Sequence, residues 1–298
     1  MRISTLIIVL LLVLTSGSIG QVPDFSKVPN MFEGDSLSIT NLITHGIKIT
    51  RGKAICWFPK DSLSRQQMDL IADTINVGIT AAEKFINAPL PWQAHLINEP
   101  YVFYFRLDSF ISHASLYGFV SIPFYRIKKG RAPWLHEAMH EMLYSKADKW
   151  FTPAMDEKFS NENMPLWFHE GLPDYIAIQV SRQNGLAFFD VFSNSTVTNT
   201  DSLFLDNMTS GNASYIISYI GAKGVMPELF LKNRMDYAPG FYHGSCSFIQ
   251  FIRDNYGLDV LLAAMSSSPK EQESIELATG KSLGALKKEW LEKLKIKQ

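Results

Sequence analysis

Two histidines separated by three residues, with a glutamate directly after the first, constrain this chain more strongly than any other feature. They are His136, Glu137 and His140 in the sequence HEAMH. Apolar residues surround them, and the segment from Pro133 to Tyr144 has the pattern of a helix with proline in its first turn. Histidine and glutamate side chains that are buried in an apolar helix need polar partners. The pattern therefore favours a functional site over a surface helix with two unrelated histidines.

The spacing of this motif has a physical reason. Side chains four residues apart project from one face of a helix, so the imidazoles of His136 and His140 can reach a single metal ion. Glu137 is turned by about 100° around the helix axis and points beside that ion. From there its carboxylate can take a proton from water that the metal activates. The motif predicts a catalytic metal site with two histidine ligands and a glutamate base.

A catalytic zinc site needs a third protein ligand and one open coordination position. The next candidate helix runs from Leu166 to Val180 and begins with the sequence LWFHEGLPDY. It contains two adjacent candidate ligands, His169 and Glu170. Because neighbouring residues of a helix diverge by about 100°, the two side chains cannot easily bind the same ion. Both remain candidates on spacing alone.

The pattern W-x-x-E-G-L-x-x-Y in this segment, after the H-E-x-x-H helix, resembles that of the thermolysin-like gluzincin zinc metallopeptidases. The resemblance implies that His136, His140 and Glu170 bind one Zn²⁺ ion. It also implies that Asp174 accepts the N–H of a liganded histidine, His136, and so orients the ring. Pro173 departs from the family, which usually has alanine at this position. Proline removes a helix hydrogen bond and can kink the helix.

A second part of the resemblance lies near the C-terminus, where Tyr242 to Gly257 reads YHGSCSFIQFIRDNYG. This sequence is similar to the family's helix Y-x-x-x-x-S-F-x-x-F-L-x-x-x-Y-G. In the family, a tyrosine or histidine of the C-terminal lobe stabilises the oxyanion that develops during hydrolysis. The resemblance implies this role for Tyr242, with the neighbouring His243 as a second candidate. Ordinary packing of an aromatic residue at a helix start is the alternative.

The stretch from Gly118 to Ile122 is a short strand candidate that ends at Pro123. Its place in the family order makes it an expected edge strand. An extended peptide could pair with the backbone of Gly118 to Val120, which would place a scissile bond over the metal. A simple covered edge strand is equally consistent. Related exopeptidases carry a G-x-M-E-N segment that anchors the substrate amine; this sequence lacks it, so endopeptidase action is preferred.

Hydrophobic periodicity predicts an α+β chain with two lobes. Residues 21–148 are expected to form a mixed N-terminal lobe with a small sheet and the metal-binding helix. Residues 149–298 are expected to form a mostly α-helical C-terminal lobe that carries the third ligand and the oxyanion donor. The polar stretch 188–214 reads as a long exposed loop. The resemblance implies a thermolysin-like catalytic architecture.

The individual elements follow from period-two and period-3.6 patterns. The expected strands lie at 46–50, 54–58, 101–105 and 118–122, and the expected helices at 64–86, 133–144, 166–180, 225–234, 242–255, 258–266 and 283–295.

Residues 1–20 read as a secretory signal peptide. Arg2 precedes nine consecutive apolar residues, Leu6 to Leu14, and the small residues up to Gly20 suit cleavage before Gln21. Nine apolar residues fall short of the roughly 20 that a membrane-spanning helix needs, which argues against an uncleaved anchor. We therefore expect a secreted or periplasmic protein with no transmembrane segment after signal removal.

Cys56 and Cys246 are the only cysteines. Export favours oxidation, so a single disulfide and two buried thiols are both consistent with the sequence. Asn194, Asn207 and Asn212 each begin an Asn-x-Ser/Thr triplet, which matters only if the source glycosylates.

The charge balance excludes one function class. With 28 basic and 29 acidic residues the net charge is −1, and no basic block stands out that would form a broad face for nucleic acid. We predict a secreted zinc-dependent peptidase, preferably an endopeptidase, that acts on peptides or proteins. A secreted zinc-containing binding module without catalytic activity is the alternative, and the intact Glu137 argues against it. The sequence does not indicate an oligomeric state.

Overall fold

The computed structural model describes residues 33–87, 101–107, 112–115, 119–144, 165–186, 200–208, 212–222, 237–267 and 270–296. Within these ranges a small five-stranded sheet precedes a mostly helical second half, so the predicted α+β class is confirmed. The expected signal peptide, the connector before the second half and the helix at 225–234 lie outside the described residues. No helix in the described ranges combines the length and the apolar character that crossing a membrane requires.

The elements of the described chain are bounded as follows. They are α2 (Glu33–His45), β1 (Ile47–Arg51), β2 (Ala54–Phe58), α3 (Arg65–Phe85), β3 (Val102–Arg106), β4 (His113–Ser115), β5 (Phe119–Pro123), α4 (Phe124–Lys128), α5 (Trp134–Tyr144), α7 (Leu166–Asn184), α8 (Thr200–Asp206), α9 (Ala213–Tyr219), α10 (Tyr237–Tyr256), α11 (Leu258–Ser266), α12 (Glu271–Thr279) and α13 (Leu283–Lys293).

The sheet has the strand order β1-β2-β3-β5-β4. Strands β1 and β2 form the predicted antiparallel hairpin, β3 runs parallel to both β2 and β5, and β4 pairs antiparallel with β5. The expectation that Gly118 to Ile122 forms an edge strand is therefore wrong. Three residues, His113 to Ser115, cover the outer side of β5 and form the edge themselves. A strand this short and polar gives almost no period-two signal, so sequence patterning missed it.

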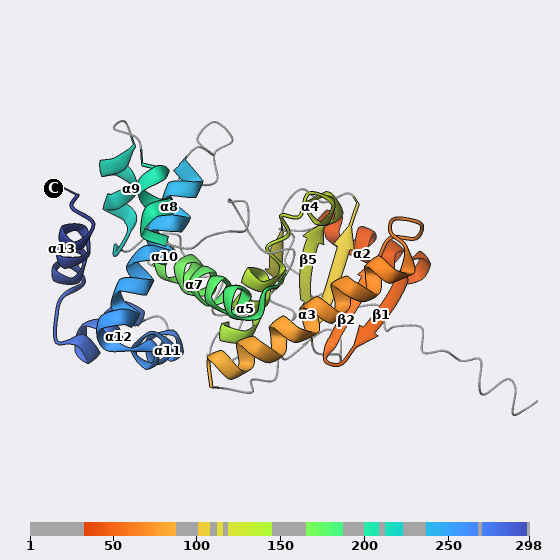
Figure 1. Cartoon of the computed structure of the whole chain (residues 1–298), viewed down its shortest axis with the longest axis horizontal. Coiled ribbons are helices and arrows are strands. Elements are labelled where there is room, and N and C mark those ends of the chain that lie inside the picture. The colour runs from red at the N-terminus through yellow and green to blue at the C-terminus, as the bar shows by residue number, and fades with distance from the viewer. Residues whose placement is uncertain are drawn as a thin grey trace, which may run out of the picture.

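Helices cover both faces of the sheet. On one face, apolar residues of α2 pack against alternate residues of β2 and β3, such as Trp57 and Tyr104. On the other face, α3 and α5 cover the opposite set, which includes Phe58 and Phe103. Figure 1 shows the sheet at one end of the molecule, helices α8 to α13 at the other, and α5 and α7 between them. Helix α5, which carries the H-E-x-x-H motif, thus lies where the two halves meet.

The long helix α3 shows why the local sequence folds as it does. Ser64 caps its first turn, because the Ser64 hydroxyl accepts from Gln67 N while the Gln67 side chain accepts from Ser64 N. Seven residues at three- and four-residue spacing are buried along one face: Met68, Ile71, Ala72, Ile75, Gly78, Ile79 and Ala82. This face supports both the sheet and the N-terminal end of α5.

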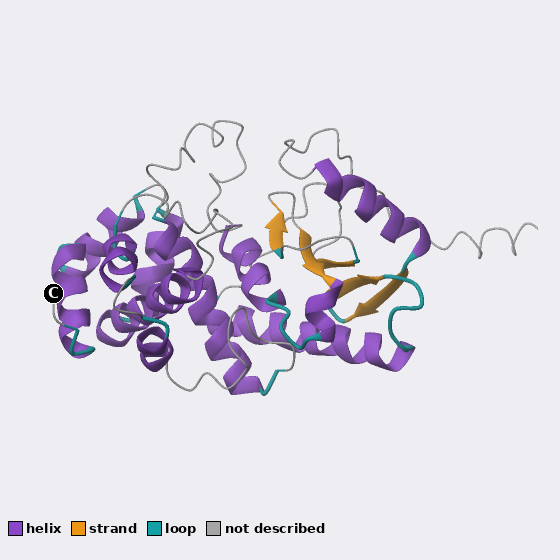
Figure 2. Ribbon diagram, turned by 90° about the horizontal axis from the view of Figure 1, so that it is seen from above, coloured by secondary structure: helices purple, strands orange, loops and turns teal. Residues whose placement is uncertain are grey.

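The second half is built around α10, which packs against α7 and α8. Figure 2 shows this end of the molecule as helices, with the strands of the sheet at the other end. The prediction of a long exposed loop at 188–214 is wrong where the structure describes it, because α8 and the beginning of α9 lie there. Phe204 and Ile216 are fully buried by these two short helices. Each helix has only seven residues, too few for a clear period. Tertiary packing forms them instead.

The two cysteines lie in different parts of the fold. Cys56 is on β2 and Cys246 is on α10, and both are free thiols with no exposed surface. Of the two arrangements consistent with the sequence, the structure has the two buried thiols.

Candidate metal centre

Helix α5 carries the H-E-x-x-H motif in a largely buried position. Its apolar residues, among them Trp134 and Met139, are almost fully buried against α3, α7 and the sheet. His136, Glu137 and His140 are also buried, with 5%, 8% and 7% of their surfaces exposed. Three polar side chains at this depth are stable only if they have polar partners or bind an ion.

The partners of the two histidines come from one another and from α7. The Nε2 atoms of His136 and His140 lie 3.0 Å apart. Glu170 Oε2 lies 3.3 Å from His136 Nε2 and 3.6 Å from His140 Nε2. Atoms that bind zinc at about 2.0–2.1 Å with tetrahedral angles are separated by about 3.3–3.4 Å. The three donor atoms therefore form a triangle of the size that one zinc ion requires.

A carboxylate oxygen of Glu137 also lies within 4.8 Å of ring nitrogens of both histidines. Glu170 approaches both imidazoles more closely than this limit, at 3.3 and 3.6 Å, and it comes from a different helix. We therefore assign Glu170 to the triangle and place Glu137 beside it. This arrangement follows from the 100° turn between adjacent residues of α5.

Asp174 holds the far side of the first histidine. Its Oδ1 atom lies 2.7 Å from His136 Nδ1 and both groups are buried. A carboxylate accepts, so Nδ1 carries a proton, and Nε2 is the ring nitrogen that faces His140 and Glu170. Burial alone would lower the pKa of His136, but the charge and hydrogen bond of Asp174, with Glu170 and Glu137, raise it well above its ordinary value.

The same cluster acts on Glu170 in the opposite direction. Burial tends to raise the pKa of Glu170, but the charge of His140 and the hydrogen bonds from both histidines outweigh it and leave the pKa well below its usual range. In the metal-free protein, Glu170 is thus an ionised carboxylate against a protonated imidazole. A cation can replace that proton without leaving an unpaired charge.

His169, the rival third ligand, points away from the triangle. Its Nε2 atom lies 3.1 Å from Glu271 Oε1 at the start of α12, and both residues have only 1% of their surface exposed. Adjacent positions on α7 thus serve different sites, as the helical turn between them requires. Sequence analysis missed Glu271, because nothing in the local pattern links two residues 102 positions apart.

The two candidate oxyanion donors, Tyr242 and His243, also point to different parts of the structure. The ring of Tyr242 lies 6.5 Å from that of His136, measured between centroids. His243 is turned toward α8, where its Nδ1 atom lies 3.1 Å from Asn207 Nδ2. The structure therefore brings Tyr242, and not its neighbour, beside a ring of the metal triangle.

Asn207 makes a second contact that bears on its Asn-x-Thr triplet. The same Nδ2 atom donates to Leu203 O at 2.8 Å, so the contacts to Leu203 and His243 occupy both of its hydrogens. A glycan on this nitrogen would remove one of them. Asn212 is buried, with 5% of its surface exposed, and Asn194 lies outside the described residues.

A close approach of α7 and α10 sets the position of these groups. A Cβ atom on Gly171 would lie 2.8 Å from Ser245 C and 2.9 Å from Ser245 O. Only glycine therefore allows the two backbones to cross here, next to Glu170 and one turn from Tyr242. Pro173 lies inside α7 just beyond this crossing, and the helix continues past it to Asn184.

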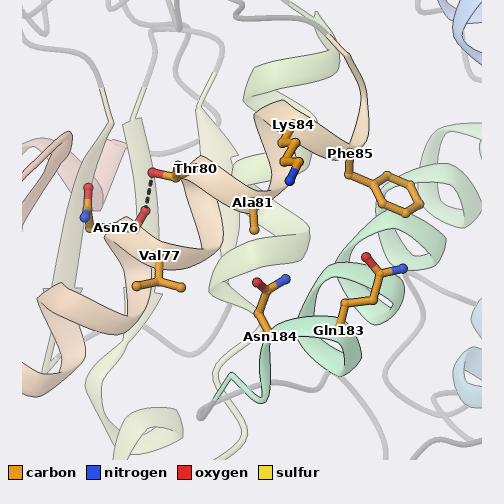
Figure 3. Close-up of a pocket in the computed structure, with 8 residues that line it drawn as sticks. All are labelled: Asn76, Val77, Thr80, Ala81, Lys84, Phe85, Gln183 and Asn184. Atoms are coloured by element: carbon orange, nitrogen blue, oxygen red, sulfur yellow. Dashed lines mark hydrogen bonds between the residues drawn. The ribbon is translucent and has the colours of Figure 1, made fainter.

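A surface cavity of about 640 Å³ lies elsewhere, between α3 and the end of α7. Figure 3 shows its walls, which include Lys84 and Phe85 on one side and Gln183 and Asn184 on the other. Gln183 follows Glu170 by about 20 Å along the axis of α7. The cavity is therefore separate from the metal triangle.

No family model matches the sequence, and no curated protein matches it either. Among solved structures, a mutant M1 zinc metallopeptidase from Deinococcus radiodurans is similar at 8% sequence identity with a TM-score of 0.37. The match covers 82% of this chain and 50% of that one, so this chain spans half the length of the matched structure. A likeness of this degree carries no argument about function. Fold and site together define an α+β protein with a buried His-His-Glu cluster of metal-binding geometry.

Proposed function

We propose that the protein is a secreted or periplasmic zinc-dependent peptidase, preferably an endopeptidase, with a thermolysin-like catalytic architecture. The observation that carries the proposal is the triangle of His136 Nε2, His140 Nε2 and Glu170 Oε2, with Glu137 beside it. Two imidazoles and one carboxylate suit zinc, and three ligands leave a coordination position for chemistry. When bound, zinc supplies Lewis-acid chemistry: it polarises a carbonyl and makes water more acidic.

The residues of the chain have distinct parts in this proposal. His136, His140 and Glu170 hold the ion, and Asp174 keeps His136 in the tautomer whose Nε2 lone pair is available. Glu137 is the general base: its carboxylate takes a proton from the attacking water and passes it to the nitrogen of the leaving amine. Its position in a buried site, beside the ligands, supports this role.

Tyr242 completes the site as the donor to the developing oxyanion. Its phenolic O–H would stabilise negative charge on the former carbonyl oxygen, and the closeness of its ring to His136 supports the assignment. His243 is not assigned to this step, because its ring faces Asn207.

Two parts of the proposal rest on the sequence. The apolar run Leu6 to Leu14, followed by small residues, supports export. The lack of a G-x-M-E-N segment supports endopeptidase action, and the lobes 21–148 and 149–298 would provide the two sides of the site.

The test uses a mixed peptide library, the purified protein and its Glu137→Gln variant, with zinc content measured on each sample. We expect chelator-sensitive cleavage by the wild type. The variant should keep its zinc and lose about 10²- to 10⁴-fold in rate, the usual contribution of a general base. Zinc retention with unchanged cleavage would refute the role of Glu137. Zinc binding without cleavage of any peptide by the wild type would favour the non-catalytic binding module.

A further inference from the structure

A cluster of cations follows the sheet and precedes the metal helix. Arg126, Lys128, Lys129 and Arg131, here called the basic turn, lie within six positions at α4 and the loop after it. Between Asp108 and Glu137 the sequence contains no acidic residue. In a chain with a net charge of −1, this is a strong local excess of positive charge.

The contacts of these cations are with aromatic rings. Arg126 Cζ lies 6.0 Å and Lys129 Nζ 5.5 Å from the centroid of the Tyr125 ring, while Lys128 Nζ lies 5.1 Å from that of Phe124. Within the described ranges, none of these three cations forms an ion pair with a carboxylate. Arg126 Nε is a buried donor without a hydrogen-bond acceptor in the same ranges. Within the described part of the chain, no carboxylate neutralises Arg126, Lys128 or Lys129, which favours an anionic partner for these three cations.

The backbone presents these charges in a fixed arrangement. Phe124 and Ile127 anchor α4 in the core, with 2% and 4% of their surfaces exposed. Gly130 adopts a φ of 63° and ends the helix, and Arg131 N donates to Arg126 O at 2.9 Å. Lys128, Lys129 and Arg131 are exposed. A pre-organised surface of this kind binds with little loss of conformational entropy.

The basic turn is close to the metal triangle along the chain. Two loop residues, Ala132 and Pro133, and less than one helical turn separate Arg131 from His136, which limits their Cα separation to about 16 Å; for Lys129 the limit is about 24 Å. An extended peptide advances about 3.3 Å per residue. Acidic residues within about five to seven positions of a scissile bond can therefore reach the basic turn.

We propose that the basic turn binds acidic side chains of the substrate, so that the site prefers acidic polypeptides. The inference rests on the proposed peptidase function. An anionic membrane surface would satisfy the same charges, but it would not need them beside the metal helix. The few residues that separate Arg131 from His136, and the limit they set on the distance, favour the substrate.

The test uses a cleavable sequence selected from the library, extended by Glu/Asp tails or by matched Gln/Asn tails on either side. We expect kcat/KM to be about tenfold higher for the acidic peptide at low ionic strength. Screening of the charges by salt should reduce this preference in kcat/KM to about threefold or less near 0.15 M salt, where the Debye length is about 8 Å. The Lys128→Glu/Lys129→Glu variant should lose the preference and keep the kcat for the neutral peptide.

The matched control is Lys288→Glu/Lys295→Glu, which changes the net charge equally on exposed residues of the C-terminal end. It should keep the acidic preference. Equal loss in both variants would show a general charge effect and overturn the proposal. Thermal unfolding of both variants shows whether they are folded.

Binding separates this inference from the proposed function. Anisotropy with a labelled acidic peptide and the Glu137→Gln protein needs no hydrolysis. Tighter binding of the acidic peptide, lost in Lys128→Glu/Lys129→Glu, supports the basic turn even if the wild type cleaves nothing. No discrimination between acidic and neutral peptides overturns it, as does binding only to vesicles that contain anionic phosphatidylglycerol.

Discussion

Asp174 Oδ1 lies 2.7 Å from His136 Nδ1, on the opposite side of the ring from the Nε2 atom that faces His140 and Glu170. The carboxylate thus fixes which nitrogen is available to an ion and holds the plane of the ring. Pro173 directly precedes Asp174 on α7, and the helix still directs the carboxylate at His136.

Removal of this carboxylate should weaken metal binding. Asp174→Ala loses both the charge and the hydrogen bond, and we expect zinc affinity to fall about 10- to 100-fold. The side-chain oxygen of Asp174→Asn can still accept from Nδ1–H, so its zinc affinity should lie between those of the wild type and Asp174→Ala. Competition against a fluorescent chelator measures the affinities. The exposed Asp259→Asn on α11 is the control, and a loss of similar size there would contradict the assignment.

Zinc binding should depend on pH through His136. Because the pKa of His136 in the metal-free protein is raised, the ring holds both protons at neutral pH and the ion must displace one. Affinity should therefore rise with pH until the raised pKa is passed, and calorimetry in buffers of different ionisation enthalpy should detect a proton released near pH 7. The Asp174→Asn variant should release a smaller fraction of a proton, because it lacks the negative charge that raises the pKa of His136. Binding without proton release would contradict this account.

Gly171→Ala should separate the two helices that carry Glu170 and Tyr242. The new Cβ meets backbone atoms of Ser245 at under 3 Å, which no side-chain rotation can relieve. We expect a stability loss of about 1–3 kcal/mol by urea unfolding, and a lower kcat with zinc still bound, because the triangle belongs to α5 and α7. Gly284→Ala on α13 is the control: its Cβ meets nothing closer than 3.9 Å. A fully active Gly171→Ala would show that the crossing does not position Tyr242.

The buried His169–Glu271 pair should be structural. Truncation of one partner leaves the other buried and uncompensated, so Glu271→Ala should cost about 3–5 kcal/mol in the free energy of unfolding. His169→Gln should also destabilise the protein yet keep one zinc per chain in metal analysis. Loss of zinc from a folded His169→Gln would restore this histidine as a ligand.

Stability should fall in alkali because of the two buried thiols. Burial raises the pKa of Cys56, and burial with Asp174 and Asp201 raises that of Cys246. Their stabilising effect is complete below the unfolded value of about 8.5 and is lost as pH rises, because only the unfolded thiols ionise. The loss is about 1.4 kcal/mol per thiol for each pH unit above 8.5. Urea unfolding at pH 7.5 and 9.5 measures it, and a Cys56→Val/Cys246→Ala variant with the same loss would refute this origin.

Hydrophobic periodicity and turn residues predicted the elements that are determined by their own local sequence. The capped, strongly periodic α3 and the hairpin of β1 and β2 were predicted within a residue or two. The three-residue β4 and the seven-residue α8 were missed, because pairing with β5 and burial of Phe204 form them, not their own propensity. Helix α12 was also missed; its first residue, Glu271, contacts His169, which lies 102 positions earlier.

Some residues of the candidate site could be predicted from local spacing, and others depend on how distant helices pack. His136, Glu137 and His140 follow from helical spacing within one segment. The choice between His169 and Glu170, and between Tyr242 and His243, depends on how α7 and α10 rotate against α5, which spacing alone leaves open. The four cations of the basic turn lie within six positions of the sequence, and the net charge of −1 does not reveal them. The sequence also does not show that aromatic rings contact Arg126, Lys128 and Lys129.

The most direct measurement of the central claim is anomalous diffraction at the zinc edge from crystals of the purified protein. The account expects one strong peak about 2.0–2.2 Å from His136 Nε2, His140 Nε2 and Glu170 Oε2, with Glu137 outside coordination distance. A peak ligated by His169 or Glu137 in place of Glu170, or no peak at α5 from zinc-supplemented crystals, would contradict it.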